Sequence, residues 1–281
     1  MIHNIFQSLF LPVIYNPVVI RVAGWFNRKL VFSNFVTVKI DKDTLFAKRL
    51  DRILALWLLK YNPARHKEAS TLKHFIRPGW TIIDIGANLG YYTLVAARSV
   101  GREGHVIAFE PNSENFESLS RSIAANSYTN IELHQTAVTQ KSGIVRLYRS
   151  DANSGDHRIY DSGDGRIYED VPGTSLDDFL KSGRRVDLIK MDIQGAEALA
   201  LAGMRRVIAE NYSCILISEF SPFHLRTSGT DPYRFLSMLQ DFGYCLGIID
   251  ESSGNIISKE ADALVKQCGK RGYINLFLRK R

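Results

Sequence analysis

Two short apolar runs in the sequence each end in an acidic residue, Asp84 after the first and Glu110 after the second. A turn that contains Gly86 and Gly90 follows Asp84 and leads into a helical pattern. Such runs are typical of buried parallel strands, and the ligand crevice of an open α/β sheet lies outside their carboxyl ends. Glycine lets the backbone approach a ligand closely, and a carboxylate that closes the next strand can accept both hydroxyls of a ribose. The pattern predicts a site for a nucleoside-containing cofactor.

The residues of the first turn discriminate between such cofactors. A dinucleotide-binding turn needs three glycines so that pyrophosphate can sit at a helix N-terminus, whereas here Asp84 stands two residues before the first glycine. An anion at this position repels pyrophosphate and suits a cationic amino group. No Gly-Lys-Ser/Thr follows, which excludes a P-loop. S-adenosylmethionine (SAM) carries an ammonium and a sulfonium but no phosphate, so it is the cofactor that we expect.

A third apolar run ends on Asp192 and turns at Gly195 into a helix. Residues 84–90 resemble motif I of class I SAM-dependent methyltransferases, and Glu110 resembles their ribose-binding acid. Together with the Lys-x-Asp-x-x-Gly-x-Glu element at residues 190–197, they closely resemble the FkbM family of methyltransferases. The resemblance extends from about residue 68 to the C-terminus, and this last element is its most specific part.

The resemblance implies a SAM-dependent O-methyltransferase that acts on a hydroxyl of a sugar, a glycan or another small molecule. Two positions depart from the family pattern. Gln194 stands where Glu is more frequent, and Lys67-Glu68 stands where Tyr-Glu is usual. The cofactor-binding residues that we expect are Glu68, Asp84, Gly86, Ala87, Asn88, Gly90, Glu110, Pro111, Ala137 and Asp192.

The catalytic groups are expected at the ends of the fourth and fifth core strands. The methyl donor is already activated, so the protein must mainly align it with a weak alcohol nucleophile, which gains from a base. Asp192 is the expected catalytic carboxylate, with Glu219 and Lys190 in support. Asp192 could instead cap the helix that follows it. His157 and His224 are further base candidates at neutral pH, although a lone histidine is more often a surface or packing residue.

Metal chemistry receives little support from the sequence. Asp192 and Glu219 could share Mg²⁺, as carboxylates on neighbouring strand ends do in catechol-type O-methyltransferases. No third ligand is evident, so we expect no metal. Cys214, Cys245 and Cys268 lack C-x-x-C spacing, which argues against a zinc site and favours buried thiols in a reducing compartment.

The charge of the chain leaves a nucleic-acid substrate as an alternative. Thirty-six Lys+Arg against 29 Asp+Glu give a net charge of +7, but the excess is spread along the sequence. An RNA methyltransferase could use the same SAM fold. Amino-directed enzymes of that kind usually carry Asn/Asp-Pro-Pro-Tyr where this chain has Asp192-Ile193-Gln194-Gly195, and residues 1–70 resemble no RNA-binding appendage. We therefore expect no nucleic-acid partner. Three intact motifs make a non-catalytic scaffold improbable.

The length of 281 residues fits one domain with an extension. We expect an N-terminal accessory segment over residues 1–66 and a SAM-dependent methyltransferase domain over residues 67–281. Residues 2–26 are apolar-rich but interrupted by polar residues and proline, which argues against a signal peptide and a membrane span. They could pack as a helix, form an oligomer contact or lie in a membrane interface. The expected location is cytoplasmic, with membrane association through this segment as an alternative.

Strands and helices alternate after residue 81, which predicts an α/β fold with a doubly wound, seven-stranded, mostly parallel sheet. The resemblance implies a Rossmann-like class I methyltransferase architecture, with an antiparallel last strand between its neighbours. The expected strands are 81–85, 105–110, 130–135, 186–191, 213–219, 243–249 and 273–279, and the expected helices are 90–99, 113–126, 195–210 and 231–242.

The accessory segment and one insertion complete the predicted organisation. Residues 31–40 alternate like a strand, and residues 45–61 have helical apolar spacing. Between the third and fourth core strands, residues 142–149 and 159–171 resemble short β pieces joined by a polar loop. Polar loops on a rigid scaffold commonly carry function. A short helix is expected to start at Ser175.

Overall fold

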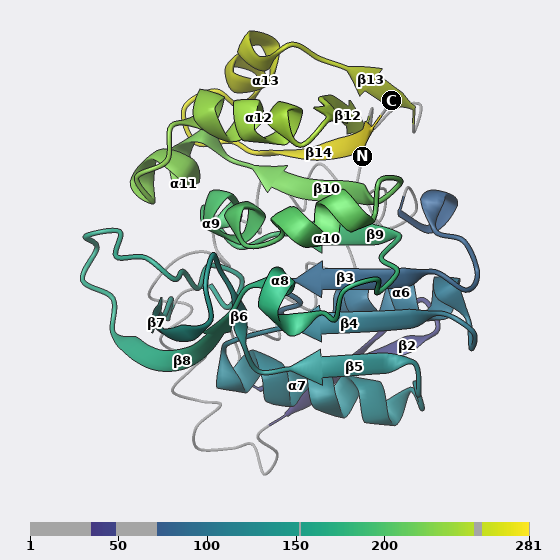
Figure 1. Ribbon diagram of the computed structural model, residues 1–281. Coiled ribbons are helices and arrows are strands. Elements are labelled where there is room, and N and C mark those ends of the chain that lie inside the picture. The colour runs from purple at the N-terminus through teal and green to yellow at the C-terminus, as the bar shows by residue number, and fades with distance from the viewer. Residues whose placement is uncertain (1–34, 49–71, 152, 250–254, 281) are drawn as a thin grey trace, which may run out of the picture.

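A mostly parallel sheet lies at the centre of this computed structural model, which describes residues 35–48, 72–151, 153–249 and 255–280 (Figure 1). Its strands are rich in isoleucine, leucine and valine because helices cover both faces. The strands with parallel partners are β3 (Thr81–Ile85), β4 (His105–Phe109), β5 (Ile131–His134), β9 (Leu188–Met191) and β10 (Ile215–Phe220).

The strand order of this sheet is β13-β12-β14-β10-β9-β3-β4-β5, and β11 also pairs with β14. The last strand, β14 (Ile274–Lys280), runs antiparallel between β10 and β12 (Gly247–Ile249). This confirms the doubly wound sheet and the place of its antiparallel strand.

Within the described residues the sheet has nine strands, where seven were predicted. The expected strand at 243–249 is divided into β11 (Tyr244–Cys245) and β12, although both keep one register against β14. Between them, the carbonyl of Leu246 accepts the backbone N–H of Lys259. An additional edge strand, β13 (Ile256–Ser258), pairs with β12.

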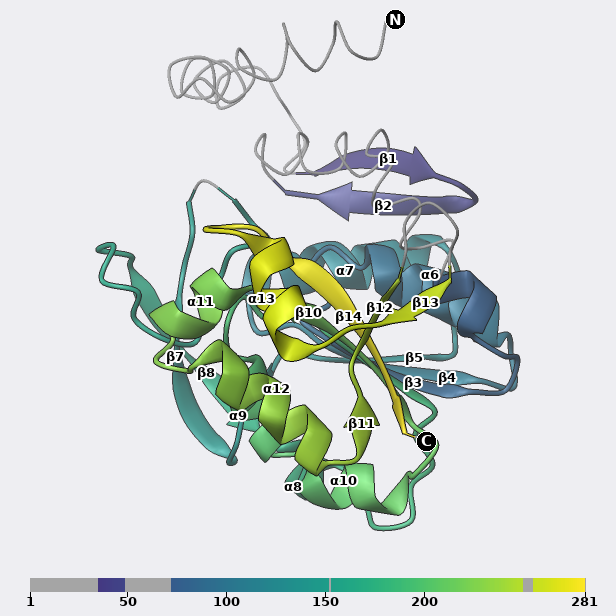
Figure 2. The ribbon, with the colours of Figure 1, turned by 90° about the horizontal axis from the view of Figure 1, so that it is seen from above.

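Helices form a layer on each side of the sheet (Figure 2). On one side lie α6 (Tyr91–Val100) and α7 (Ser113–Ala125). On the other lie α8 (Leu176–Phe179), α9 (Glu197–Ala202), α10 (Arg205–Glu210) and α12 (Pro232–Asp241). Two further helices, α11 (Pro222–Thr227) and α13 (Ala261–Cys268), follow β10 and β13.

The helix expected over residues 195–210 is two helices, α9 and α10. The first ends at Gly203, where an added Cβ would lie 2.3 Å from the carbonyl oxygen of Thr139. The second has its own cap, because the carboxylate of Asp177 accepts the backbone N–H groups of Arg206 and Val207 at 3.0 and 2.9 Å. Two short helices with separate caps therefore replace one long helix.

An antiparallel hairpin of β1 (Val36–Ile40) and β2 (Asp43–Ala47) packs beside α7 (Figure 2). The strand predicted at 31–40 is confirmed over β1, whereas the helix predicted from residue 45 is wrong at 45–47. Side chains of α7 decide the outcome: Asn126 accepts the backbone N–H of Thr44 at 2.8 Å and Ser122 that of Phe46 at 3.0 Å. The rest of the predicted helix, residues 2–26 and the domain boundary at 66/67 lie outside the described residues.

The insertion forms a three-stranded sheet of β6 (Ala137–Val138), β7 (Gly143–Tyr148) and β8 (Tyr168–Thr174). Figure 1 shows it at the edge of the main sheet where the parallel strands end. The β piece predicted at 142–149 is confirmed, but that at 159–171 is a strand only from residue 168. Residues 159–167 form a loop whose side chains contact the candidate site. Helix α8 begins after Ser175, whose hydroxyl caps it.

The described part of the chain contains no helix with the length and apolar character that a membrane span requires.

Candidate active site

The turn after β3, residues 86–90, is called the β3 turn. Gly86 and Gly90 have φ angles of 78° and 92°, and Asn88 also lies in the left-handed region at 52°. The backbone N–H groups of Gly86 and Ala87 both donate to the carbonyl of Phe109 at 3.0 Å. A Cβ on Gly86 would lie 2.1 Å from the backbone oxygen of Asp192, so the β3 turn packs directly against the end of β9.

Glu110 is buried beside the β3 turn, where the next strand ends. Its carboxylate accepts the backbone N–H of Asn88 at 2.7 Å and that of Asn112 at 3.0 Å. The side-chain amide of Asn115 donates to it at 3.3 Å. Three donors stabilise the charged form and fix the carboxylate in place. Pro111 follows directly and leads into α7.

The groups around Glu110 fit the adenosine part of SAM. The side-chain oxygens of Asn88 and Asn115 are buried without a hydrogen-bond partner. Buried polar atoms are rarely left unpaired in native proteins. Ribose hydroxyls and an adenine amino group are donors that would satisfy two such acceptors next to a carboxylate.

The insertion reaches this part of the site. The carbonyl of Ser154 accepts the side-chain N–H of Asn115 at 3.0 Å, and Ser154 itself is buried. Gly155 lies against Asn88, since an added Cβ would be 3.2 Å from the Asn88 side-chain nitrogen. Residues 153–155 therefore cover the β3 turn beside Glu110.

Lys190 contacts Asp84 across the β3–β9 strand pair. The Nζ of Lys190 lies 3.2 Å from Oδ1 of Asp84, which is 2 % exposed. The hydroxyl of Thr93 donates to the other oxygen at 2.6 Å. Lys190 also lies over the ring of Tyr92, 5.0 Å from its centroid. The structure thus pairs Lys190, a predicted catalytic residue, with Asp84, a predicted cofactor-binding residue. That Lys190 supports Asp192 in catalysis stays a prediction.

The turn after β9, residues 192–196, is called the β9 turn, and it brings the predicted catalytic acids together. The side-chain nitrogen of Gln194 donates to Asp192 at 2.9 Å and to Glu219 at 3.1 Å. Nδ1 of His224, on α11, lies 3.6 Å from the second oxygen of Glu219. Burial, and after it the charge of Arg158, lowers the pKa of His224 below its ordinary value. The Gln194 amide therefore bridges the two carboxylates, and the neutral imidazole of His224 lies beside one of them.

Glu197 holds the β9 turn from within. Its carboxylate accepts the backbone N–H groups of Ile193 and Gly195 at 3.1 and 3.2 Å. Helix α9 has Ala196 at its N-cap, whose N–H donates to the carbonyl of Ile193, and capping of this helix by Asp192 stays a prediction. Burial, with a smaller contribution from the charge of Asp192, raises the pKa of Glu197 to about 7.

Tyr160, from the insertion, holds the same turn from outside. Its hydroxyl donates to the backbone oxygen of Gln194 at 2.7 Å. Gly195 leaves the space for this contact, because an added Cβ would lie 2.7 Å from the Tyr160 hydroxyl and 2.6 Å from the carbonyl oxygen of His224. Burial raises the pKa of Tyr160 to about 12, so it is a donor at neutral pH. Sequence reasoning missed Tyr160, since no local pattern marks a contact with a turn so distant along the chain.

Other expected site residues lie elsewhere. Ala137 is buried in β6 and packs in a cluster with Leu147 and Val171. Nδ1 of His157 accepts the backbone N–H of Ser150 at 3.0 Å within the insertion. Glu68 lies outside the described residues.

Neither a metal cluster nor a disulfide is found in the ranges that the structure describes. No group of three or more His, Cys, Asp and Glu side chains there could hold a metal ion. Cys214, Cys245 and Cys268 are free thiols, and burial raises the pKa of Cys214 to about 12 and that of Cys268 to about 11.

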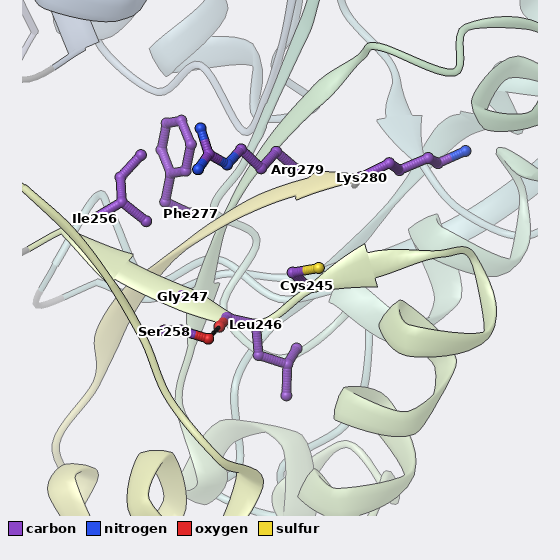
Figure 3. Close-up of a pocket in the computed structure, with 8 residues that line it drawn as sticks. All are labelled: Cys245, Leu246, Gly247, Ile256, Ser258, Phe277, Arg279 and Lys280. Atoms are coloured by element: carbon purple, nitrogen blue, oxygen red, sulfur yellow. Dashed lines mark hydrogen bonds between the residues drawn. The ribbon is translucent and has the colours of Figure 1, made fainter.

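A cavity of about 450 Å³ lies between β11, β12, β13 and β14 (Figure 3). Its lining includes Arg279 and Lys280, at the end of β14 that lies beside the start of β10. The cavity therefore lies toward the end of the sheet where β10 starts, whereas Glu219 lies near the other end of that strand. No candidate catalytic or cofactor residue lines it, and we assign the reaction to the two turns. Its complete lining is Cys245, Leu246, Gly247, Ile256, Ser258, Phe277, Arg279 and Lys280.

The sheet order and the two turns define a class I SAM-dependent methyltransferase. The chain belongs to the FkbM methyltransferase family, since the Methyltransferase FkbM domain matches residues 84–246, more than half of its length. SAM is therefore its cofactor, and the residues around the β3 turn and Glu110 fit that cofactor. No curated protein matches the chain in sequence.

Several solved structures are similar to this chain at low identity. A SAM-dependent methyltransferase from Aquifex aeolicus is 15 % identical with a TM-score of 0.42, covering 79 % of this chain and 90 % of that one. TYW2 from M. jannaschii in complex with AdoMet is 12 % identical with a TM-score of 0.45, covering 90 % of each chain. An rRNA methylase from Streptococcus thermophilus is 9 % identical with a TM-score of 0.43, covering 76 % of this chain and 95 % of that one.

Proposed function

We propose that this methyltransferase transfers the methyl group of SAM to a hydroxyl of a sugar, a glycan or another small molecule. The observation that carries the proposal is the pair of carboxylates, Asp192 and Glu219, joined by Gln194 at the edge of the sheet. Gly86 packs against the backbone of Asp192, so this pair lies directly beside the turn that we expect to bind the cofactor. Two carboxylates accept hydrogen bonds from neighbouring hydroxyls, which is the chemistry that a polyol offers.

When bound, SAM supplies an electrophilic methyl group on a positively charged sulfur. Glu110 and the side-chain oxygens of Asn88 and Asn115 would hold its adenosine. Asp192 accepts a hydrogen bond from the acceptor hydroxyl, directs an oxygen lone pair toward the methyl group and takes up the proton as the new bond forms. Glu219 holds a neighbouring hydroxyl. His224, neutral at physiological pH, can accept a proton from the Glu219 side of the pair.

The charges around the pair support an uncharged acceptor over RNA. Arg158 and Arg166, the cations nearest to His224 in the insertion, both donate to Asp156, at 2.8 and 2.7 Å. Ion pairing within the insertion offsets the positive charge of these two arginines, so it is not directed at a phosphate backbone. Asp192 and Glu219 would repel phosphate at the reaction site.

A cytoplasmic location is part of the same proposal. The three thiols are free, as expected in a reducing compartment. An oligomer or membrane contact through residues 2–26 stays a prediction.

Two experiments test the proposal. In calorimetry we expect the protein to bind SAM and S-adenosylhomocysteine but not NAD; tight NAD binding without SAM binding would contradict it. Extracts from cells that lack the gene are then incubated with the protein and isotope-labelled SAM. Mass spectrometry of glycans, lipids and small polar compounds should show a mass increase of one methylene that Asp192→Asn does not produce.

RNA is included in the same incubation as a separate fraction, with gel shifts at graded salt. Label in RNA, together with micromolar affinity at physiological salt, would favour the RNA methyltransferase instead.

A further inference from the structure

Gln194 occupies a position where the family more often has Glu, and its side chain lies between the two carboxylates of the site. We propose that Gln194 is a positioning residue that holds Asp192 and Glu219 as a pair of ionised carboxylates at a fixed spacing for the acceptor hydroxyls. This inference rests on the proposed function for its link to turnover. It concerns a role that the contacts of this chain supply and that a glutamate could not perform.

The hydrogen-bond inventory of glutamine explains the arrangement. A primary amide nitrogen carries two N–H donors, and here each carboxylate receives one, at 2.9 Å from Asp192 and 3.1 Å from Glu219. Hydrogen bonds that charged carboxylates accept are stronger than neutral ones and favour the ionised form. A single group therefore sets both the protonation state and the separation of the pair.

The backbone of Gln194 is held in an uncommon conformation to make this possible. Its φ is 56°, in the left-handed region that few non-glycine residues adopt. Tyr160 donates to its carbonyl at 2.7 Å, and Glu197 accepts the N–H of the next residue, Gly195, at 3.2 Å. Strained backbone persists where the surroundings over-determine it and is concentrated at functional sites. The contacts of Tyr160 and Glu197 keep the Gln194 amide directed at the pair.

Charged and titratable groups face the pair from every neighbouring element. Glu197 lies on α9, His224 on α11 and Cys268 on α13, where the charge of Glu219 raises the pKa of the Cys268 thiol after burial does. Arg158 and Arg166 face this region from the insertion, but Asp156 binds both. The local balance is acidic, which makes an uncharged donor between Asp192 and Glu219 effective.

Glutamate at this position would reverse the effect. Gln194→Glu replaces the two donors with a third carboxylate, and like charges at this spacing raise the pKa of at least one member of the group. Gln194→Met keeps the length and volume but removes the donors. Gln240→Glu makes the same chemical change on an exposed surface position of α12 and serves as the matched control.

The decisive experiment is a pH titration of ¹³C-labelled carboxyl groups by NMR, with Asp192 and Glu219 assigned by substitution. In Gln194→Glu we expect one carboxyl of the cluster to titrate about one pH unit or more above either wild-type group. In Gln194→Met we expect a smaller upward shift, and none in Gln240→Glu. Unchanged titration of both carboxyls in Gln194→Met would overturn the proposal even if Gln194→Glu failed to fold.

Turnover with the acceptor found above provides the second readout. In Gln194→Glu the acidic limb of the pH profile of turnover should move to higher pH together with the carboxyl titration midpoint seen by NMR, while SAM affinity stays constant. A purely structural role would lower the melting temperature without moving that limb. Because the titration needs no acceptor, a shifted titration with no methylated hydroxyl would reject the proposed function alone. Normal O-methylation with an unshifted titration would reject the role of Gln194 alone.

Discussion

The β3 turn and the β9 turn are similar in backbone but differ in what holds them. Each follows a buried parallel strand, contains a glycine with positive φ and includes one non-glycine residue in the left-handed region, Asn88 or Gln194. The β3 turn is held by Phe109 and Glu110, which belong to the next strand of the same βαβ unit. The β9 turn is held by Glu197, which directly follows it, and by Tyr160 from the insertion. The half of the site that we expect to bind the cofactor is thus held mainly by neighbouring segments, although residues 153–155 cover it, whereas the expected acceptor half also needs Tyr160 from a distant segment.

This difference has a functional consequence. Every enzyme of the family must bind the same cofactor, so the β3 turn needs only the contacts that a strand and its neighbour provide. The acceptor differs from one enzyme to another, and loops on a rigid scaffold are where such variation is tolerated. Changes around Tyr160 are expected to alter acceptor choice while leaving SAM binding intact, whereas changes at residues 153–155, which lie against Asn88 and Asn115, should affect SAM binding too.

The strongest test of the comparison is Asp192→Asn, which should affect the β9 turn alone. Asparagine keeps an acceptor for the Gln194 amide but loses the negative charge. We expect turnover to fall by roughly 10² to 10⁴, as for a lost general base, with SAM affinity and melting temperature preserved. Asp241→Asn on the surface of α12 is the control. Wild-type turnover would move the search for a base to Glu219 and His224.

Gly86→Ala should damage both turns at once. The added Cβ would meet the backbone oxygen of Asp192 at 2.1 Å in a left-handed conformation. Strain and overpacking together are expected to cost about 4 kcal/mol in the free energy of unfolding, measured by chemical denaturation. Gly183→Ala is the matched control because its φ of 77° is similar and nothing lies within 4 Å. Gly183→Ala should cost about 1–2 kcal/mol. Equal losses of stability in the two variants would mean that the β3 turn is not closely packed against the β9 turn.

Glu197→Gln tests how the β9 turn responds to pH. The pKa of Glu197 is about 7 in the folded protein against 4.5 for the free group, so its contribution to stability is full below pH 4.5 and is lost as pH rises toward 7. Glutamine keeps the acceptor for Ile193 and Gly195 but cannot ionise. Denaturation at several pH values should show equal stability near pH 4.5 and a variant more stable by about 3 kcal/mol at pH 8. Parallel curves for the two proteins would contradict the burial of this carboxyl.

Glu110→Ala should affect the β3 turn alone. The predicted charge-assisted hydrogen bond from the ribose to Glu110 would be lost; it is worth roughly 1.5–3 kcal/mol, so calorimetry should show SAM binding weakened by about 10- to 100-fold. The exposed Glu103→Ala should leave SAM affinity unchanged. Retained affinity in Glu110→Ala would mean that the carboxylate only supports the backbone of Asn88 and Asn112.

Tyr160→Phe is the mildest change and tests the distant contact. Losing the hydrogen bond to the Gln194 carbonyl should cost about 1 kcal/mol of stability and reduce turnover a few-fold, with SAM affinity unchanged. Tyr212→Phe, at a residue that is 62 % exposed, controls for the loss of a hydroxyl. Weakened SAM binding in Tyr160→Phe would show that the β3 turn depends on the contacts that hold the β9 turn.

The same contrast explains how far the sequence predicts this site. The neighbouring positions of the β3 turn and Glu110 follow from the geometry of a βαβ unit, which a local pattern is sufficient to reveal. The pairing of Asp192 with Glu219 follows from adjacent strand ends. The bridge by Gln194 was visible only as a departure from the family pattern.

Contacts between distant segments account for what sequence reasoning missed. Tyr160 lies 34 residues from Gln194, and nothing in its surroundings marks it. Residues 45–47 have helical apolar spacing but form a strand, because Asn126 of the α7 C-terminus, 82 residues away from Thr44, accepts its N–H. Local propensity is a weak prior where tertiary hydrogen bonds intervene.

The ion pair between Lys190 and Asp84 also constrains how the protein is synthesised. Its partners are 106 residues apart, and both are buried when the protein is folded. While the chain emerges from the ribosome, β3 and the cofactor-binding half are complete long before β9 exists. Asp84 must therefore stay hydrated, because burying an unpaired carboxylate is unfavourable. The central strand β3 is expected to become protected late, when β9 arrives and Lys190 pairs with Asp84.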